Sequence, residues 1–225
     1  MIIYGKQIFL YVLEKYPSLI EEIYLSKEVD KKLFAKLTRL NKPIVRLDTK
    51  KAQAMARGGN HQGMFLKIAD IDFTLFSEVK KSDFILVLHG VTDIGNIGAI
   101  IRSGYALGID AIVVTGIRSL PLDALVRTSS GAIFEMPIVL FPDTGTLLNE
   151  LKQSGFTTYA ATMDGDDVRQ MTFEARKALV MGSEGEGLPA KIVSKCDHQV
   201  AIRMQRPFDS LNVSVAAAIL CDRMR

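Results

Sequence analysis

The stretch FILVLHGVTDIGNIGAIIRSGYALGIDAIVVTG, residues 84–116, decides the fold of this chain. Two nearly continuous apolar runs flank a segment whose apolar residues recur at helical spacing, and a glycine-containing turn separates the first run from that segment. Apolar strands that alternate with helices are typical of a parallel sheet covered on both faces. Further strand candidates lie at residues 156–163, 178–182 and 199–204. The sequence therefore predicts an α/β fold built on a parallel sheet.

The first part of the chain alternates helices and strands on its own. Helical patterns occupy residues 5–16 and 27–40, and short apolar segments around them read as strands. Residues 71–82 lack clear periodicity, so we place a linker there. We expect a small α/β domain at residues 1–70 and a larger domain at residues 83–225.

Composition is that of an ordinary globular protein, with 48% hydrophobic and 24% charged residues among 225. Cys196 and Cys221 are the only cysteines, too few for a disulfide framework or a zinc site, which favours a reducing, cytoplasmic setting. The start of the chain lacks the long apolar core of a signal peptide, and no run approaches the roughly 20 apolar residues of a membrane span. We expect neither a resident metal nor a membrane contact.

Charge is unevenly distributed along the chain. Residues 1–80 hold 14 Lys and Arg against 9 Asp and Glu, whereas residues 81–225 hold 14 against 16. The basic first part is the better candidate for contact with a nucleic acid, and a solvated surface rich in lysine is the alternative.

Three polar, glycine-containing turns follow strand candidates, at residues 90–102, 181–187 and 204–212. Ligands of open parallel sheets bind beyond the carboxyl ends of the strands, so these turns are the site candidates. The first turn lacks the full G-x-G-x-x-G spacing of a dinucleotide site, and no P-loop sequence occurs.

The second turn, VMGSEGEGLP at residues 180–189, combines glycines with Glu184 and Glu186. Glycine turns after strands often bind phosphate through backbone N–H groups, but carboxylates repel phosphate. The turn suits a ligand that carries hydroxyls, amines or positive charge, and S-adenosylmethionine has all three without a phosphate. The alternative is a tight turn whose glutamates lie near a helix N-terminus.

Polar residues of the other two turns are also open to two interpretations. Asn96 could cap a helix and Arg102 could form a surface salt bridge, or both could serve a site. Ser210 and Asn212 begin an apolar segment with several small residues, which is at least a buried helix.

Taken together, NIGAIIR, MGSEGEG and SLNVSVAAAI, in this order and spacing, resemble the three motifs of the SpoU (TrmH-like) RNA ribose 2′-O-methyltransferases. The first part, with YGKQIF near its start and NHQGMF near its end, resembles the L30e-like substrate-binding domain of that family. Within the family, the resemblance is strongest to the bacterial enzymes that methylate a guanosine of 23S rRNA.

The resemblance implies a catalytic domain of the SPOUT class with a C-terminal trefoil knot. It implies a homodimer in which the terminal helix and the helix beginning near Asn96 pack at the subunit interface. It also implies S-adenosylmethionine as methyl donor and RNA, with 23S rRNA expected, as substrate. A tRNA guanosine methyltransferase and a non-catalytic RNA-binding protein with this fold are the alternatives.

Site residues carried over from the family fall into two groups. The catalytic set is Asn96, Arg102, Glu184, Ser210 and Asn212. The set expected to contact the methyl donor is Gly182, Ile202, Leu211, Thr162 and Met204. The chain departs from the family at QRPFD, residues 205–209, where Arg206 and Asp209 stand in a loop that is commonly small and neutral.

Overall fold

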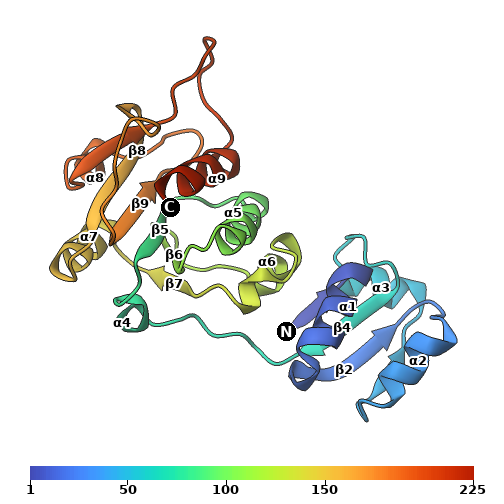
Figure 1. Cartoon of the computed structure of the whole chain (residues 1–225). Coiled ribbons are helices and arrows are strands. Elements are labelled where there is room, and N and C mark those ends of the chain that lie inside the picture. Colours follow the sequence, from blue (N-terminus) through green and yellow to red (C-terminus); the bar gives the residue numbers. More distant parts are fainter. The chain divides into compact units, whose positions relative to one another are not determined.

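The computed structural model describes all 225 residues (Figure 1). The chain divides into two compact units. The first comprises Met1–Asp72 together with Pro121–Gly131, and the second comprises Phe73–Leu120 together with Ala132–Arg225. No helix is long and apolar enough to cross a bilayer.

The first unit contains a four-stranded mixed sheet in the order β1-β4-β2-β3. Strand β4 pairs antiparallel with β1 and β2, and β3 pairs parallel with β2 at the edge of the sheet. The elements are β1 (Ile2–Tyr4), α1 (Lys6–Lys15), a 3-10 turn (Pro17–Leu19), β2 (Ile20–Leu25), α2 (Lys31–Thr38), β3 (Ile44–Arg46), α3 (Thr49–Met55) and β4 (Met64–Ile68).

Helix α2 begins four residues later than the pattern at 27–40 predicts. The carboxylate of Asp30 accepts a hydrogen bond from the backbone N–H of Leu33 at 2.8 Å, and the backbone of Asp30 is extended. An aspartate in this geometry caps a helix, because it satisfies an N–H that has no partner within the helix. The cap therefore sets the start of α2.

The second unit contains six parallel strands in the order β10-β8-β9-β5-β6-β7. The prediction of a parallel α/β sheet is confirmed. The strands are β5 (Phe84–His89), β6 (Ala111–Thr115), β7 (Ile138–Phe141), β8 (Thr157–Asp167), β9 (Lys177–Met181) and β10 (His198–Ala201).

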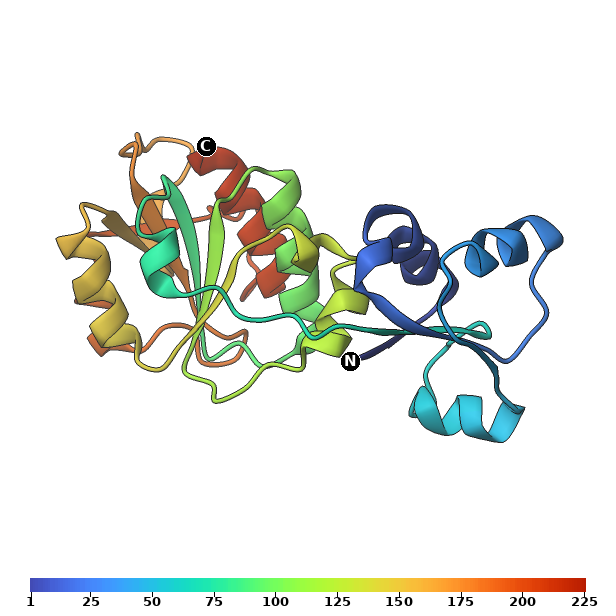
Figure 2. The ribbon, with the colours of Figure 1, turned by 90° about the horizontal axis from the view of Figure 1, so that it is seen from below.

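Helices cover both faces of this sheet, as Figures 1 and 2 show. On one face, Ile85 and Val87 of β5 join a buried cluster with side chains of three helices, namely α4 (Phe76–Val79), α7 (Thr144–Gln153) and α8 (Ala190–Val193). On the other face lie α5 (Ile94–Ala106) and α9 (Val213–Met224), which pack against each other. Because β5, β6 and β9 are buried on both faces, their sequences are apolar except for one terminal residue each, namely His89, Thr115 and Lys177.

Two details of the chain after β6 differ from the sequence pattern. Strand β7 is absent from the predicted strands, because four residues between Pro137 and Pro142 give too short a run. The segment 121–134, which reads as one helix, is interrupted after α6 (Leu122–Thr128) by Ser130 and Gly131. Both residues have positive φ, 54° and 89°, which a right-handed helix cannot contain.

Helix α6 belongs to the first unit, although it lies far from the rest of that unit in the sequence. It packs against β1, where the guanidinium of Arg127 lies 4.6 Å from the ring centre of Tyr4. This distance is that of a cation–π contact. At the end of the same segment, a Cβ on Gly131 would lie 2.5 Å from the ring of Tyr11.

Strands β8 and β10 approach unusually closely at Gly165. A Cβ added there would lie 2.7 Å from the backbone nitrogen of Val200. The pairing of the two strands shifts at this point, between Gln199 and Val200. Only a residue without a side chain therefore allows β10 to lie in its observed place.

We predict that Gly165→Ala lowers the free energy of unfolding by about 1–3 kcal/mol, the usual cost of forcing an extra methyl group into a packed site. Gly185→Ala is the matched control, because a Cβ at Gly185 would meet no atom within 4 Å. Urea unfolding followed by circular dichroism measures both variants. Equal midpoints for Gly165→Ala and the wild type would contradict the packing argument.

Candidate active site

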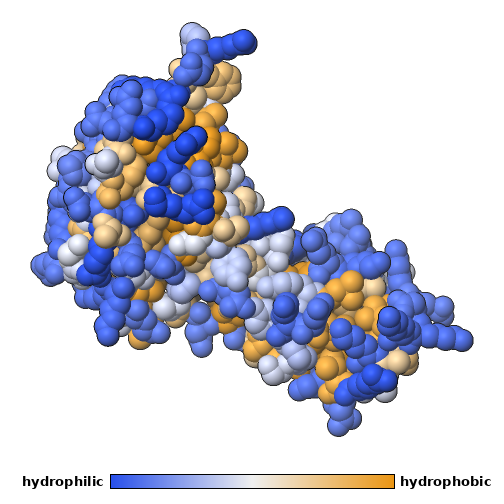
Figure 3. Space-filling view, viewed as in Figure 1, coloured by the Kyte–Doolittle hydropathy of each residue, from blue (hydrophilic) through white to orange (hydrophobic).

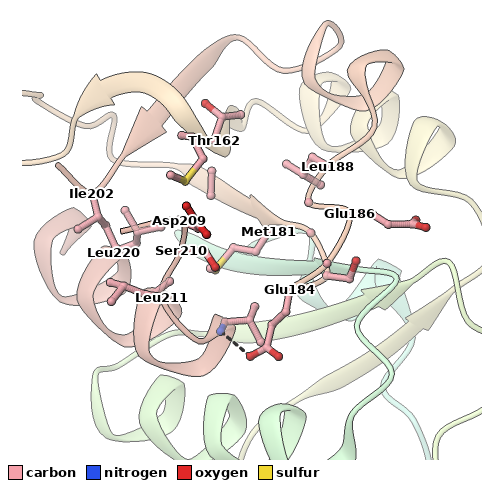
Figure 4. Close-up of a pocket in the computed structure, with 18 of the residues that line it drawn as sticks. Thr162, Met181, Glu184, Glu186, Leu188, Ile202, Asp209, Ser210, Leu211 and Leu220 are labelled. Atoms are coloured by element: carbon pink, nitrogen blue, oxygen red, sulfur yellow. Dashed lines mark hydrogen bonds between the residues drawn. The ribbon is translucent and has the colours of Figure 1, made fainter. Parts of the chain in front are cut away.

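A cavity of about 650 Å³ lies at the carboxyl ends of β8, β9 and β10 (Figure 4). Its wall comes from residues 161–164 of β8, just past the pairing of β8 with β9, and from residues 181–188 at the end of β9 and in the turn after it. Ile202, Met204 and residues 209–211 after β10 and side chains of α9 complete it. This is the edge of a parallel sheet at which ligands bind. Two of the three predicted turns, 181–187 and 204–212, meet here.

The turn after β9 closes on itself. The backbone N–H of Gly187 donates to the carbonyl oxygen of Ser183 at 3.0 Å, and Gly187 has a φ of 65°. A Cβ at Gly182 would lie 2.1 Å from backbone atoms of Gly187. Glycine is required at Gly182 for space and is favoured at Gly187 for conformation.

The carboxylate of Glu184 holds the motif residues of three segments together. Its Oε1 accepts hydrogen bonds from Nδ2 of Asn96 at 3.2 Å, from Nδ2 of Asn212, and from the backbone N–H of Val213 at 3.1 Å. Nδ2 of Asn212 also donates to Oδ1 of Asn96 at 2.9 Å. Figure 4 shows Glu184 with a dashed line ending at its carboxylate.

Asn212 is also the cap of α9. Its Oδ1 accepts from the backbone N–H of Ser214 at 3.0 Å. The N–H of Val215 also donates to this oxygen at 3.4 Å, so with Val213 donating to Glu184 three of the free N–H groups at this helix end have side-chain acceptors. A glutamate near a helix N-terminus is therefore present, as the alternative interpretation of the turn holds, but the helix is α9 rather than the one that follows the turn in sequence.

Asn96 is not the cap of its helix. Asp93 fills that role, since its Oδ1 accepts from the backbone N–H of Asn96 at 2.7 Å. The side chain of Asn96 is thereby available to bond Glu184 and Asn212. The capping interpretation of Asn96 is wrong.

The cavity brings together most of the other predicted site residues. Gly182, Ile202, Leu211, Thr162 and Met204, the expected contacts of the methyl donor, all line it, and so does Ser210. Figure 4 shows Thr162 of β8 and, from the two ends of the loop between β10 and α9, Ile202 and Leu211 around the same space.

Arg102 lies apart from this cavity. It is exposed on α5, six residues after Asn96, and does not line the cavity. Six residues of α-helix correspond to a rise of about 9 Å and a rotation of about 240°. The side chains of Asn96 and Arg102 therefore leave the helix in different directions.

Carboxylates that the sequence analysis did not select also line the cavity. Asp164, Glu186 and Asp209 join Glu184 on its wall, beside apolar residues such as Met181, Leu188 and Leu220. Four carboxylates make the cavity hostile to phosphate and suited to a cationic ligand with hydroxyls. The Asp164 carboxylate follows the predicted strand at 156–163, so inspection of each strand end for acidic residues would have found it.

The two cysteines offer no reactive thiolate. Burial raises the pKa of Cys196 to about 11 and that of Cys221 to about 12. Thiols with such pKa values stay protonated at neutral pH and are poor nucleophiles. No group of three or more His, Cys, Asp or Glu side chains in the structure has an arrangement suited to a metal ion.

Residues 83–222 match the SpoU rRNA Methylase family, and residues 2–73 match the family described as RNA 2′-O ribose methyltransferase substrate binding. The chain belongs to the SpoU family of RNA methyltransferases. The recognition of its three motifs in the sequence is thereby confirmed.

Relatives in other organisms support this membership. The chain is 35% identical over 155 residues to an Archaeoglobus fulgidus protein described as an uncharacterized tRNA/rRNA methyltransferase, covering 68% of this chain and 69% of that protein. It is 32% identical over 169 residues to a Staphylococcus haemolyticus protein assigned to the TrmH family of tRNA/rRNA methyltransferases, covering 71% and 68%.

Solved structures share the fold over almost the whole chain. The AdoMet-bound rRNA methyltransferase of Sinorhizobium meliloti has a TM-score of 0.80 and 22% identity, covering 99% of this chain and 85% of that one. The SpoU methyltransferase AviRb of Streptomyces viridochromogenes, in complex with AdoMet, has a TM-score of 0.80 and 21% identity, covering 99% and 88%.

We predict that Glu184→Ala lowers the melting temperature by about 2–4 °C, the shift expected for about 1 kcal/mol in a chain of this size. Glu184→Gln should melt within about 1 °C of the wild type, because its amide oxygen can still accept from Asn96, Asn212 and Val213. Calorimetric scans of both variants measure the shift. Equal destabilisation by Gln and Ala would mean that the negative charge of Glu184, and not its hydrogen-bond acceptor, stabilises the contacts among Asn96, Glu184 and Asn212.

Proposed function

We propose that this chain transfers a methyl group from S-adenosylmethionine to the ribose 2′-oxygen of a guanosine in 23S rRNA. The observation that carries the proposal is the Glu184 junction, in which Asn96, Glu184 and Asn212 bond one another beside the cavity. The donor carries an electrophilic methyl group on a sulfonium. Once the methyl group is transferred, the rest of the donor leaves as a neutral thioether. The new bond joins the 2′-oxygen to the methyl carbon as the methyl–sulfur bond breaks, and the hydroxyl proton passes to water.

The cavity fits this donor by its chemistry. Its volume of about 650 Å³ lies in the range of small-ligand sites. Apolar residues such as Ile202 and Leu211 suit the flat, poorly hydrated parts of the ligand, and the carboxylates suit its hydroxyls, its amino group and its cationic sulfur.

The 2′-hydroxyl would be aligned by the residues at the entrance to α9. Ser210 lines the cavity, and Asn212 stands beside it, held by Glu184. Fixing the attacking oxygen in line with the methyl carbon lowers the activation free energy, because the entropy of alignment is already lost when the substrate binds. Glu184 and Asn96 act here as positioning residues.

Arg102 would bind the RNA phosphate next to the target ribose and lower the cost of forming the 2′-alkoxide. A guanidinium is a poor base, because it is already protonated and does not lose that proton in proteins. Arg102 does not line the cavity of its own chain. A homodimer with α5 and α9 at the interface would bring it to the site of the second protomer. The trefoil knot of the catalytic domain belongs to the same proposal.

The substrate-binding role of residues 1–70 rests on the basic surface of α2. Lys31, Lys32 and Lys36 are exposed on this helix, and the exposed ring of Phe34 lies 6.0 Å from the guanidinium of Arg46. Phosphates bind cations, and unstacked bases bind exposed rings and guanidinium planes. This surface therefore suits RNA.

The test of the function is transfer of tritiated methyl from S-adenosylmethionine to RNA purified from a strain that lacks the gene. We expect label in alkali-resistant dinucleotides, because a 2′-O-methyl group blocks cleavage of the next phosphodiester. Mapping of the site should identify a guanosine of 23S rRNA. Label in tRNA would favour the tRNA enzyme, and no transfer with intact RNA binding would favour a non-catalytic protein.

Cofactor choice gives a second prediction. Calorimetric titration should show binding of S-adenosylhomocysteine and no binding of NADH, because the four carboxylates repel a pyrophosphate. Gly182→Ala should abolish the binding, since its Cβ would overlap the backbone of Gly187. Tight binding of NADH would overturn the assignment.

Arg102 gives a third prediction. Arg102→Lys and Arg102→Ala should both reduce single-turnover methylation by at least about a hundredfold, because lysine keeps the charge but loses the planar fork of donors. The affinity for S-adenosylhomocysteine should stay within about twofold of the wild type. Wild-type rates in Arg102→Ala would end this role for Arg102.

The basic surface gives a fourth prediction. The slope of log affinity for RNA against log salt is negative. Replacing Lys31, Lys32 and Lys36 together by Gln should make it less negative by about 2, because each lost phosphate contact removes about 0.7–0.9 from its magnitude. The matched control replaces the exposed Lys15, Lys81 and Lys191. Equal slopes for both triple variants would show that α2 is no special RNA contact.

A further inference from the structure

The loop between β10 and α9 carries a feature that the reaction described above does not use. Phe208 is 72% exposed, more than any other large apolar side chain in the structure, and Met163 nearby is 56% exposed. A second hollow of about 420 Å³ is lined by Met163, Met204, Arg206 and Phe208, among others. An exposed aromatic ring and an arginine thus share one concave surface.

This hollow adjoins the cavity of the candidate active site. Met163, Ile202 and Met204 line both spaces. The loop projects from the body of its unit in Figure 1, and in Figure 3 its tip shows hydrophobic and hydrophilic side chains next to each other. Anything seated on Phe208 would therefore lie beside the methyl-donor cavity.

The base of the loop is anchored to β8. The guanidinium of Arg203 donates to the carbonyl oxygen of Gly165 at 2.7 Å and to that of Met163 at 3.5 Å. Pro207 fixes its own φ directly before Phe208. The backbone that leads to Phe208 is thus restrained on its N-terminal side.

We propose that residues 205–208 form a contact for the substrate RNA, in which a base next to the methylated nucleotide stacks on Phe208 and its phosphate pairs with Arg206. The proposal rests on the proposed function, since the target ribose must enter the adjoining cavity. Stacking on an aromatic ring together with a guanidinium contact is how proteins hold unstacked bases. The positive charge of Arg206 favours a polyanion over an apolar partner.

The test compares Phe208→Ala with Phe208→Trp in the full-length protein. The matched control is Leu75→Ala, because Leu75 is 67% exposed and lines neither space. RNA from a strain without the gene is the substrate, and kcat/KM is measured at saturating S-adenosylmethionine. We expect about a tenfold loss for Phe208→Ala, from the strength of base–aromatic stacking, and less than about a twofold change for Phe208→Trp and Leu75→Ala.

Arg206 is tested by salt dependence. Arg206→Gln should make the slope of log affinity for the same RNA against log salt less negative by about 0.7–0.9, and Arg206→Lys should leave the slope unchanged. Unchanged kcat/KM in Phe208→Ala would overturn the proposal. So would a parallel loss of S-adenosylhomocysteine affinity, which would assign the ring to the donor, or a shift in sedimentation, which would assign it to a second copy of this chain.

The same variants separate failure of this inference from failure of the proposed function. If the wild type transfers no methyl to RNA, the proposed function fails. The loop is then judged by filter binding of the same RNA in the presence of S-adenosylhomocysteine. Weaker binding by Phe208→Ala than by Leu75→Ala would support the contact, and equal binding would overturn it.

Discussion

The Glu184 carboxylate is the interaction on which the geometry of the site depends. One oxygen accepts hydrogen bonds from side chains of α5 and of the α9 cap, and from the first backbone N–H of α9. Asn96 lies 88 residues before Glu184 in the chain, and Asn212 lies 28 residues after it. A carboxylate oxygen is an acceptor only, so it can serve several donors at once.

The parallel sheet explains why these segments can meet. All six strands point the same way, so the segments after β5, β9 and β10 leave the sheet at one edge. Glycines at 165, 182 and 187 then allow backbone segments to approach each other there or to turn sharply. The sheet supplies the common edge, and the glycines allow the loops to close over it.

The sequence predicted the central strands and the long helices, because buried strands and helical spacing leave strong patterns. The residues selected as donor contacts from the motif spacing line one cavity. The prediction failed where a single hydrogen bond, a single backbone angle or an unexpectedly long strand decides the structure. Asp30 and Asp93 set helix starts through single hydrogen bonds, and Ser130 ends a helical pattern through one backbone angle. The carboxylate of Asp164 reaches the cavity only because β8 extends past the pairing that its apolar run predicts.

The packing of α6 against β1 has a consequence for how the chain can be divided. The backbone passes between the two units three times, after residues 72, 120 and 131. A single proteolytic cut in the segment 71–82 would therefore leave the fragments joined, since the downstream fragment still supplies a helix to the first unit. The nicked protein would run as two bands on a denaturing gel and yet elute from a sizing column as one species.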